Sequence, residues 1–322
     1  MNQYNPPFQV TRLMLRKVAE MSEMVGRWSA SKQGLNPGLR RENRVRSIQA
    51  SLAIENNSLS VNEVTAVLSG QKVLGPAREI QEVKNAFSAY EGMNNWSPSS
   101  EKDLLKAHDV MMRGLIDDSG VYRQGDVGIY QGQEVVHMAP GAKRVPFLMA
   151  DLFEWLARTE DHPLIASCVF HYELEFIHPF SDGNGRMGRL WQTLILSRWH
   201  EELGYLPVET VIKEKQEGYY QSLAMADKAG ESTVFIEFLL EALFEVMNET
   251  ITVKRSGKVS EKTSEKILRE MGQKSSITIT ELSTVLGVST RSVERNIRHL
   301  QDIGLLKRIG SARSGHWEVV GD

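Results

Sequence analysis

Apolar residues recur every three or four positions along most of the first 250 residues, which is the spacing of amphipathic helices. A helix is expected over 11–27, and a stretch rich in Gly, Asn and Pro over 34–38 predicts a connecting loop. The same spacing predicts helices over 44–54, 61–68, 76–93, 100–112, 145–158, 162–177, 185–199, 213–226 and 233–253. The expected fold class is therefore mostly α.

One segment has a different pattern. Over 125–138, short apolar runs lie on either side of Gln131-Gly132, which is typical of a β-hairpin. Pro140 and Gly141 follow it directly and end the extended structure. A single hairpin within a helical domain is therefore expected.

Length and composition limit the functional classes. The 322 residues are about twice the usual length of one domain, so two domains are expected. The formal net charge is −3, so any binding to nucleic acid must be local. The single cysteine, Cys168, excludes an internal disulfide, and residues 1–10 lack the pattern of a signal peptide. No apolar run approaches the roughly 20 residues of a membrane span, and a cytoplasmic protein is expected.

The composition changes near residue 254. Residues 254–263 are polar and rich in Gly, Ser and Lys, which predicts a linker. The linker would separate a first domain over 1–253 from a small second domain over 264–322. No internal repeat appears along the chain.

The second domain has the pattern of a winged helix-turn-helix. Two helices follow a predicted short strand over 277–279, and two further strands form the wing. Arg291, Arg295 and Arg298 recur along the later helix and are candidates for contacts with DNA phosphates. Dimerisation or docking of another protein is the alternative use of such a domain, and both stay open.

Residues 178–189, His-Pro-Phe-Ser-Asp-Gly-Asn-Gly-Arg-Met-Gly-Arg, join two predicted helices. Gly183 and Gly185 flank Asn184, so backbone N–H groups at the start of the second helix can approach an anion. These features predict a phosphate-binding loop.

Four side chains of this segment suit phosphate chemistry. Arg186 and Arg189 lie three residues apart on one helical face, where two guanidinium groups can hold successive phosphates. Asp182 supplies an oxygen ligand for Mg²⁺. The ordinary pKa of a histidine lies near neutrality, so His178 can accept a proton from an attacking hydroxyl.

Other motifs do not fit. Residues 183–188 also match G-x-G-x-x-G, but the strands of a dinucleotide-binding fold are absent from the pattern. Neither the H-E-x-x-H of zinc peptidases nor a P-loop occurs. His171 is expected to be a packed or hydrogen-bonded helix residue.

Residues 178–189 match all nine fixed positions of the Fic motif, H-P-F-x-(D/E)-G-N-G-R-x-x-R, and the chain resembles the Fic (Fic/Doc) family over about 3–243. The resemblance implies a Fic-type helical domain in which the hairpin is a flap that docks a target. It implies transfer of AMP from ATP, with Mg²⁺, to a Ser, Thr or Tyr hydroxyl of a target protein or of the chain itself. It assigns His178 as the base, Asp182 as the metal ligand, and ATP binding to Ser181, Asp182, Gly183, Asn184, Gly185, Arg186, Arg189 and Tyr220. For Tyr220 a core position is the alternative.

Residues 51–56, Ser-Leu-Ala-Ile-Glu-Asn, fit the inhibitory pattern (S/T)-x-x-x-E-(G/N) of many Fic proteins. The resemblance implies that Ser51 and Glu55 are inhibitory and that Glu55 pairs with Arg189 in place of the γ-phosphate. An ordinary solvated helix end is the alternative. Relief of inhibition by a change of homo-oligomer, by metal or by self-modification stays open.

Two other functions stay open at this point. A Fic-type enzyme can transfer a different group or remove AMP with the same loop. The chain can also be a DNA-binding regulator whose Fic-like domain senses a nucleotide.

Overall fold

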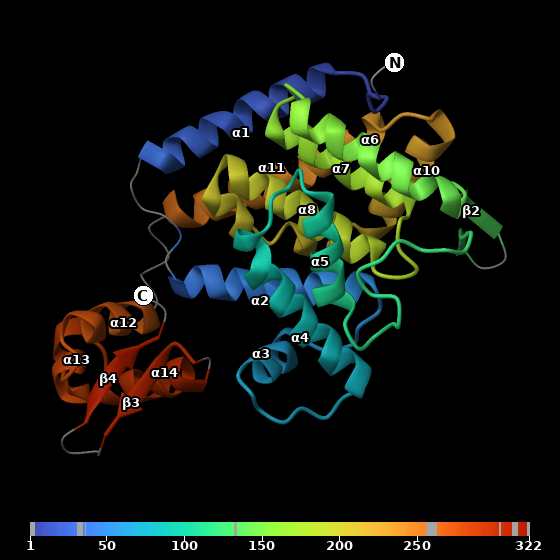
Figure 1. Ribbon diagram of the computed structural model, residues 1–322. Coiled ribbons are helices and arrows are strands. Elements are labelled where there is room, and N and C mark those ends of the chain that lie inside the picture. Colours follow the sequence, from blue (N-terminus) through green and yellow to red (C-terminus); the bar gives the residue numbers. More distant parts are fainter. Residues whose placement is uncertain are drawn as a thin grey trace.

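A helical body and a small C-terminal domain make up the molecule (Figure 1). The computed structural model describes residues 4–30, 35, 37–131, 134–255, 263–302, 304–310 and 315–320. Buried apolar side chains form one continuous cluster in the helical body and a second cluster in the C-terminal domain. Each domain therefore has a core of its own.

The helical body confirms the mostly α fold class. Its helices are α1 (Arg12–Ala30), α2 (Pro37–Ile54), α3 (Val61–Leu68), α4 (Ala77–Gly92), α5 (Glu101–Met112), α6 (Val145–Arg158), α7 (Pro163–Ile177), α8 (Asn184–Trp199), α9 (Val208–Glu214), α10 (Gln216–Ala229) and α11 (Thr233–Arg255). Short 3₁₀ turns are η1 (Met93–Asn95), η2 (Ala142–Arg144) and η3 (Glu201–Tyr205). Within the described ranges, every helix is too short or too polar to cross a bilayer.

Two helix boundaries differ from the prediction. Helix α2 begins at Pro37, so the end of the predicted loop over 34–38 is helical. Proline is favoured in a first helical turn because its missing N–H has no partner to lose there. The predicted helix over 213–226 is instead two helices, α9 and α10, which meet at Lys215. The φ of −108° and ψ of 31° at Lys215 interrupt the helical geometry.

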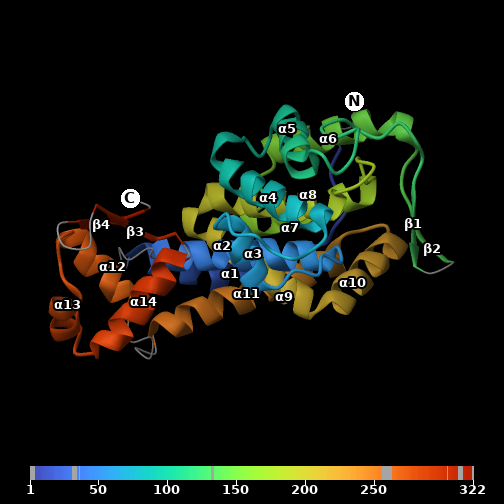
Figure 2. The same ribbon diagram turned by 90° about the horizontal axis from the view of Figure 1, so that it is seen from below.

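Helices α7 and α8 occupy the centre of the helical body. All residues from Leu164 to Leu174 on α7 are buried, as are almost all from Asn184 to Leu196 on α8. A helix that is buried on all sides lies inside a fold, and the other helices of the body surround these two (Figures 1 and 2). The loop that joins α7 to α8 is therefore anchored at both ends in the core.

The predicted hairpin is present. Strands β1 (Gly128–Gln131) and β2 (Glu134–Met138) pair antiparallel, with Gly128 opposite Met138 and Gln131 opposite Glu134. The register shifts once, between Ile129 and Tyr130. The hairpin projects from the helical body at the end away from the C-terminal domain (Figure 2).

The C-terminal domain is a winged helix, as predicted. It contains α12 (Thr263–Gln273), α13 (Ile279–Leu286) and α14 (Thr290–Asp302), followed by the antiparallel pair β3 (Leu306–Ile309) and β4 (His316–Val319). The predicted strand over 277–279 is wrong. Thr278 caps α13: its hydroxyl accepts from the N–H of Glu281, whose carboxylate accepts from the N–H of Thr278.

The two ends of the predicted linker over 254–263 are helical. Helix α11 runs to Arg255 and α12 begins at Thr263. The residues of the linker between these two helices lie outside the described part of the chain.

The N-terminal segment is fastened to α7 through a buried carboxyl group. The hydroxyl of Tyr4 donates to Oε2 of Glu173 at 2.7 Å. Burial, followed by the charge of Asp227, raises the pKa of Glu173 from 4.5 to about 7, although the hydrogen bond from Tyr4 acts in the opposite direction. The folded state therefore binds this proton more tightly than the unfolded state, and ionisation of Glu173 destabilises the fold as the pH rises through this range.

Replacing Glu173 by Gln is expected to remove this part of the pH dependence. The difference between the pKa of 4.5 for a free carboxyl group and the pKa of about 7 for Glu173 corresponds to roughly 3 kcal/mol of unfolding free energy. Thermal unfolding of both proteins at about pH 5 and about pH 8 measures the effect. The midpoint temperature of Glu173→Gln, relative to that of the native chain, should be higher at about pH 8 than at about pH 5. An equal difference between the two proteins at both pH values would contradict titration of Glu173.

Candidate active site

The turn between α7 and α8 holds the predicted catalytic segment in a compact loop. His178 ends α7 in the left-handed conformation, with φ 49° and ψ 61°. Gly183 precedes α8 with φ 89°, and a Cβ at this position would lie 2.7 Å from Sδ of Met112. Asn184 closes the loop because its Oδ1 accepts from the N–H of Phe180 and its Nδ2 donates to the carbonyl of Phe180, both at 2.9 Å. The loop is thus held by its own contacts.

His108, which the sequence analysis missed, supports this loop from α5. Its ring stacks on Phe180 with centroids 3.6 Å apart. Its Nδ1 accepts from the N–H of Gly120 at 2.9 Å, so the proton lies on Nε2, which donates to the carbonyl of Asp182 at 3.0 Å. Burial lowers the pKa of His108 to about 4, so the ring is neutral at neutral pH. No sequence pattern marks a lone histidine in an amphipathic helix for this role.

A cavity of about 670 Å³ opens beside the loop, a size typical of small-molecule sites. Its walls come from the segment just after α2, the end of α7, the loop, the start of α8, and α10. The predicted site residues that line it are Glu55, His178, Ser181, Asp182, Gly183, Asn184, Gly185, Arg189 and Tyr220. Residues from three helices, from the loop and from the segment just after α2, far apart in the sequence, therefore meet at one cavity.

Arg189 joins the start of α8 to the end of α2. Its Nε donates to Oγ of Ser51 at 3.0 Å, and its NH2 donates to the carbonyl of Ser51 at 3.1 Å and to Oε1 of Glu55 at 2.7 Å. Burial disfavours the charge of Arg189, but Glu55, Tyr219 and Glu175 together outweigh it, so the pKa of Arg189 is raised. Glu55 itself follows the last residue of α2 and lines the cavity.

Gly185 permits this close arrangement. A Cβ at Gly185 would lie 2.6 Å from Oε1 of Glu55 and 3.0 Å from NH1 of Arg189. Any larger residue would displace one of these charged groups. The glycine in the first turn of α8 thus leaves the space that the ion pair fills.

Arg186 does not line the cavity, and its contact with a phosphate stays a prediction. Its NH2 donates to Oδ1 of Asp182 at 2.8 Å, and its NH1 lies 3.8 Å from Oε1 of Glu82. The side chain is only 4% exposed. Ser51 is likewise absent from the lining of the cavity, because its hydroxyl accepts from Arg189.

Asp182 is the one predicted metal ligand. Its carboxylate is 41% exposed, lines the cavity and also lies 3.4 Å from NH2 of Arg78. One accessible carboxylate fits Mg²⁺, which keeps several waters and binds one or two carboxylates together with substrate phosphates. Among the residues that the structure describes, no group of three or more His, Cys, Asp or Glu side chains could hold a metal by itself.

The adjacent tyrosines of α10 have different environments. Tyr219 is buried, and its hydroxyl lies 3.1 Å from Nε2 of His171 and 3.3 Å from Oε1 of Glu175. Tyr220 is 47% exposed and lines the cavity, so it is not a core residue. Its contact with adenine stays a prediction. His171 is buried and hydrogen-bonded to Gln192, as expected.

Three acidic residues that the sequence did not assign to the site also line the cavity. Glu175 lies near the end of α7, and Glu217 and Asp227 lie on α10. Each resembles a solvated helix residue in the sequence, and only the packing of α10 against α7 brings them together. With Glu55 and Asp182 they give the cavity an excess of carboxylates, so an anionic ligand would need accompanying cations.

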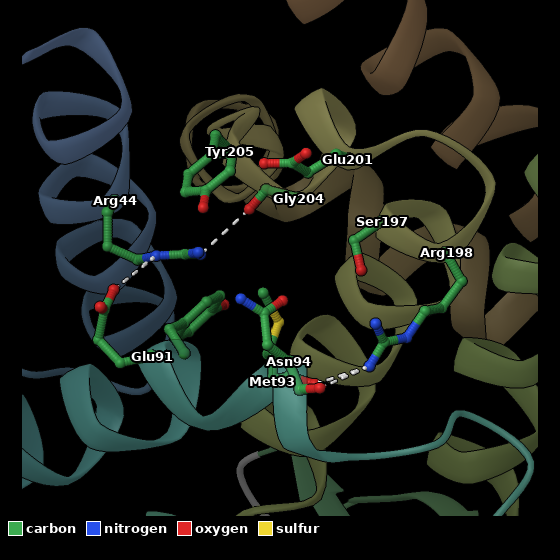
Figure 3. A pocket seen from close by; sticks show the side chains of 10 residues that line it. Arg44, Glu91, Met93, Asn94, Ser197, Arg198, Glu201, Gly204 and Tyr205 are labelled. Carbon is green, nitrogen blue, oxygen red and sulfur yellow. Dashed lines mark hydrogen bonds and ion pairs between the residues drawn. The ribbon is translucent and has the colours of Figure 1, made fainter. Parts of the chain in front are cut away.

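A second cavity, of about 360 Å³, lies between α2, α4, α8 and η3 (Figure 3). NH1 of Arg44 donates to the carbonyl of Gly204 at 3.1 Å. NH2 of Arg198 donates to the carbonyls of Met93 and Asn94, each at 3.2 Å. The first of these guanidinium groups joins α2 to η3, and the second joins α8 to η1. No predicted site residue lines this second cavity.

The three arginines proposed for DNA are all exposed on one side of α14. Arg291, Arg295 and Arg298 face solvent, whereas Val293 and Ile297 on the same helix are buried in the domain core. Contact with DNA stays a prediction.

Comparison with known families gives two matches. The model of the Fic/DOC family matches residues 98–196, and a model described as winged helix-turn-helix DNA-binding matches residues 260–307. The first contains the loop between α7 and α8, and the second contains α12, α13 and α14.

Curated relatives match part of the chain. A protein adenylyltransferase Fic of Culex quinquefasciatus is 29% identical over 227 residues, 66% of this chain and 43% of the relative. Protein adenylyltransferase fic-1 of Caenorhabditis elegans is 29% identical over 196 residues, 59% of this chain and 37% of the relative. This chain thus spans about two fifths of the length of these relatives.

A solved structure matches nearly the whole chain. The crystal structure of a Fic family protein from Desulfovibrio desulfuricans G20 is 48% identical, has a TM-score of 0.76 and is matched over 99% of each chain. Both the helical body and the winged helix are included in that match. This chain belongs to the Fic family.

Proposed function

We propose that this chain is a protein adenylyltransferase that moves AMP from ATP to a Ser, Thr or Tyr hydroxyl of a protein. One observation carries the proposal: His178, Asp182, the loop over 183–185 and Arg189 line a single cavity of nucleotide size. The names of the curated relatives support the same activity.

In the proposed reaction, His178 takes the proton of the target hydroxyl. The hydroxyl oxygen forms a bond to the α-phosphorus of ATP, and the bond from this phosphorus to the oxygen that bridges the α- and β-phosphates breaks. Pyrophosphate leaves, and the protein carries AMP through a phosphodiester bond. The left-handed backbone of His178, fixed at the end of α7, directs the imidazole into the cavity.

The start of α8 would hold the phosphates. The backbone N–H groups that begin this helix favour an anion, and Gly183 and Gly185 carry no Cβ that could obstruct it. Asp182 would hold Mg²⁺, which would supply positive charge to the phosphate oxygens. Such a charge offsets the surrounding carboxylates of Glu55, Glu175 and Glu217.

We further propose that Glu55 inhibits the enzyme. Its Oε1 lies 2.7 Å from NH2 of Arg189, and the guanidinium group of Arg189 is the one assigned to the terminal phosphate. An ATP that lacks this contact would lie in a pose unfit for in-line attack on the α-phosphorus.

The test uses ATP labelled with ³²P at either the α- or the γ-phosphate, with Mg²⁺ and the Glu55→Gly protein. Incorporation of the α-label alone, with release of pyrophosphate, would support AMP transfer. Incorporation of the γ-label would indicate phosphate transfer. Bound ATP without incorporation of either label would favour transfer of another group, removal of AMP, or nucleotide sensing.

A second function, DNA binding by the winged helix, is supported by the exposed arginines of α14. If Arg291, Arg295 and Arg298 contact phosphates, replacing all three by Ala should weaken duplex binding by the full chain. The slope of log K against log salt concentration should fall by about 3, since each phosphate contact contributes about 1. Binding isotherms at several salt concentrations measure this slope.

The matched control removes the same charge elsewhere. Arg16, Lys84 and Lys102 are exposed on the helical body, and their triple replacement by Ala should leave the slope unchanged. An equal loss of duplex affinity in both triple variants would indicate nonspecific attraction. Absence of DNA binding by the native chain would favour a protein partner for the winged helix.

A further inference from the structure

Arg123 is a buried arginine between α5 and β1 that binds main-chain carbonyls only, among its described hydrogen bonds. Its Nε donates to the carbonyl of His178 at 2.7 Å, and its NH2 donates to that of Ile177 at 3.3 Å. NH1 donates to the carbonyl of Gly125 at 2.8 Å, and NH2 also donates to that of Pro140. One guanidinium group therefore links two separate parts of the chain.

The first part is the start of the catalytic loop. The backbone N–H of Arg123 donates to the carbonyl of Pro179 at 2.9 Å, so this single residue binds the carbonyls of Ile177, His178 and Pro179. These three consecutive peptides include the left-handed turn at His178, a conformation that residues with a Cβ rarely adopt. A side chain that fixes the carbonyl on each side of this turn stabilises it against relaxation.

The second part is the neck of the hairpin. Gly125 lies before β1 and Pro140 lies after β2, so Arg123 binds both chains where the hairpin leaves the body. Oδ1 of Asp126 accepts from the N–H of Ala142 at 2.7 Å and closes the same neck. The position of the hairpin is thus connected to the guanidinium group through main-chain contacts.

We propose that Arg123 is a positioning residue that holds His178 in its left-handed conformation and transmits the position of the hairpin to the imidazole. This inference rests on the proposed function, in which His178 takes the proton. A segment that docks on the hairpin and shifts its neck would act on the same group that fixes His178. Because a small displacement of a base costs much rate, occupancy of the hairpin would tune transfer without any contact to the nucleotide.

The test compares Arg123→Lys with Arg198→Lys, both in the full chain that carries Glu55→Gly. Lysine keeps the charge of Arg123 but loses the planar fork that reaches several carbonyls. Arg198 is the matched control because its NH2 also donates to main-chain carbonyls, those of Met93 and Asn94 (Figure 3). The same NH2 donates to the carbonyl of Trp96. Self-modification with α-labelled ATP gives the maximal rate and the ATP concentration at half-maximal rate.

Arg123→Lys is expected to lower the maximal rate about 10- to 100-fold and to change the half-maximal ATP concentration by less than about 2-fold. Arg198→Lys should keep the maximal rate within about 2-fold, and the thermal midpoints of both variants show how much each substitution destabilises the fold. Asp126→Ala, which loosens the neck and leaves Arg123 intact, should lower the maximal rate by about 3-fold or more.

Equal losses of rate in Arg123→Lys and Arg198→Lys would overturn the proposal, since they would reflect general destabilisation. An unchanged rate in Asp126→Ala would overturn the link to the hairpin, and this variant also decides the matter if Arg123→Lys does not fold. If the Glu55→Gly chain binds ATP but transfers no label, the proposed function fails. A crystal structure of Arg123→Lys then tests the positioning role directly: we expect residue 178 to leave the left-handed region, and an unchanged φ would overturn it.

Discussion

Replacing His178 by Ala in the Glu55→Gly chain is expected to reduce AMP transfer by a factor of about 10² to 10⁴, the usual contribution of a general base. Without the imidazole, the target hydroxyl must lose its proton to water while it attacks the α-phosphorus. ATP binding should persist, because the contacts assigned to the phosphates lie on the start of α8 and do not include this side chain. Initial rates of α-label incorporation, together with calorimetric ATP affinities, measure both effects.

A second variant separates loss of the base from loss of the backbone shape. His178→Asn removes the base but suits the left-handed conformation, which asparagine adopts more readily than most residues. It should be as inactive as His178→Ala. His200→Ala, at a histidine that contacts Ser29 far from the cavity, should retain the rate. Substantial transfer by His178→Asn would exclude the proposed base.

Glu55→Gly is expected to raise AMP transfer by about 10- to 100-fold over the native chain. A hydrogen bond between charged partners contributes about 1.5 to 3 kcal/mol, and each 1.4 kcal/mol corresponds to a factor of ten. The guanidinium of Arg189 would exchange one carboxylate partner for a phosphate, while Ser51 keeps it in place. The transfer rate of Glu55→Gln should lie between those of the native chain and Glu55→Gly, because glutamine removes the charge but keeps much of the side chain.

The control for this substitution breaks another ion pair of the same helix. Oε1 of Glu202 accepts from NH2 of Arg40 on α2 at 2.8 Å, and Glu202→Gln weakens this pair without touching Arg189. It should leave the transfer rate unchanged. If Glu202→Gln activates the chain as strongly as Glu55→Gly, a general loosening of α2 is the cause and the specific role of Glu55 is wrong.

The parts of the fold that could be predicted are those in which local pattern and tertiary structure agree. The apolar spacing predicts α7 and α8 because both are buried, and the run of glycines predicts the turn between them. The strand predicted over 277–279 fails because Ile277 and Ile279 alternate as in a strand, yet Thr278 caps a helix. The pair Thr278 and Glu281 is a capping signal that the sequence did contain.

The cavity could be predicted only in part. His178, Asp182 and Arg189 follow from one contiguous motif, and Glu55 follows from a short second motif. Arg123 and His108 bind main-chain carbonyls and N–H groups, which nearly every residue carries. The amino-acid sequence therefore contains no pattern that identifies such contacts. Such residues become visible only when the path of the backbone is known.

The strength of the contact between Glu55 and Arg189 and the ease with which it breaks depend on different parts of the chain. The ion pair determines the first, and the position of Glu55 at a helix end determines the second. Glu55 lies just beyond α2, where its N–H donates to the carbonyl of Leu52 and the next residue, Asn56, is left-handed. Helix ends open by local fraying at a fraction of the free energy of global unfolding. Ser51, one turn earlier, can stay bound to Arg189 throughout. In the proposed inhibition, the strength of the ion pair would set how completely transfer is suppressed, and fraying of a single turn would set how long the suppressed state lasts. Hydrogen exchange at the amides of Glu55 and Asn56 should therefore report how often the contact between Glu55 and Arg189 breaks.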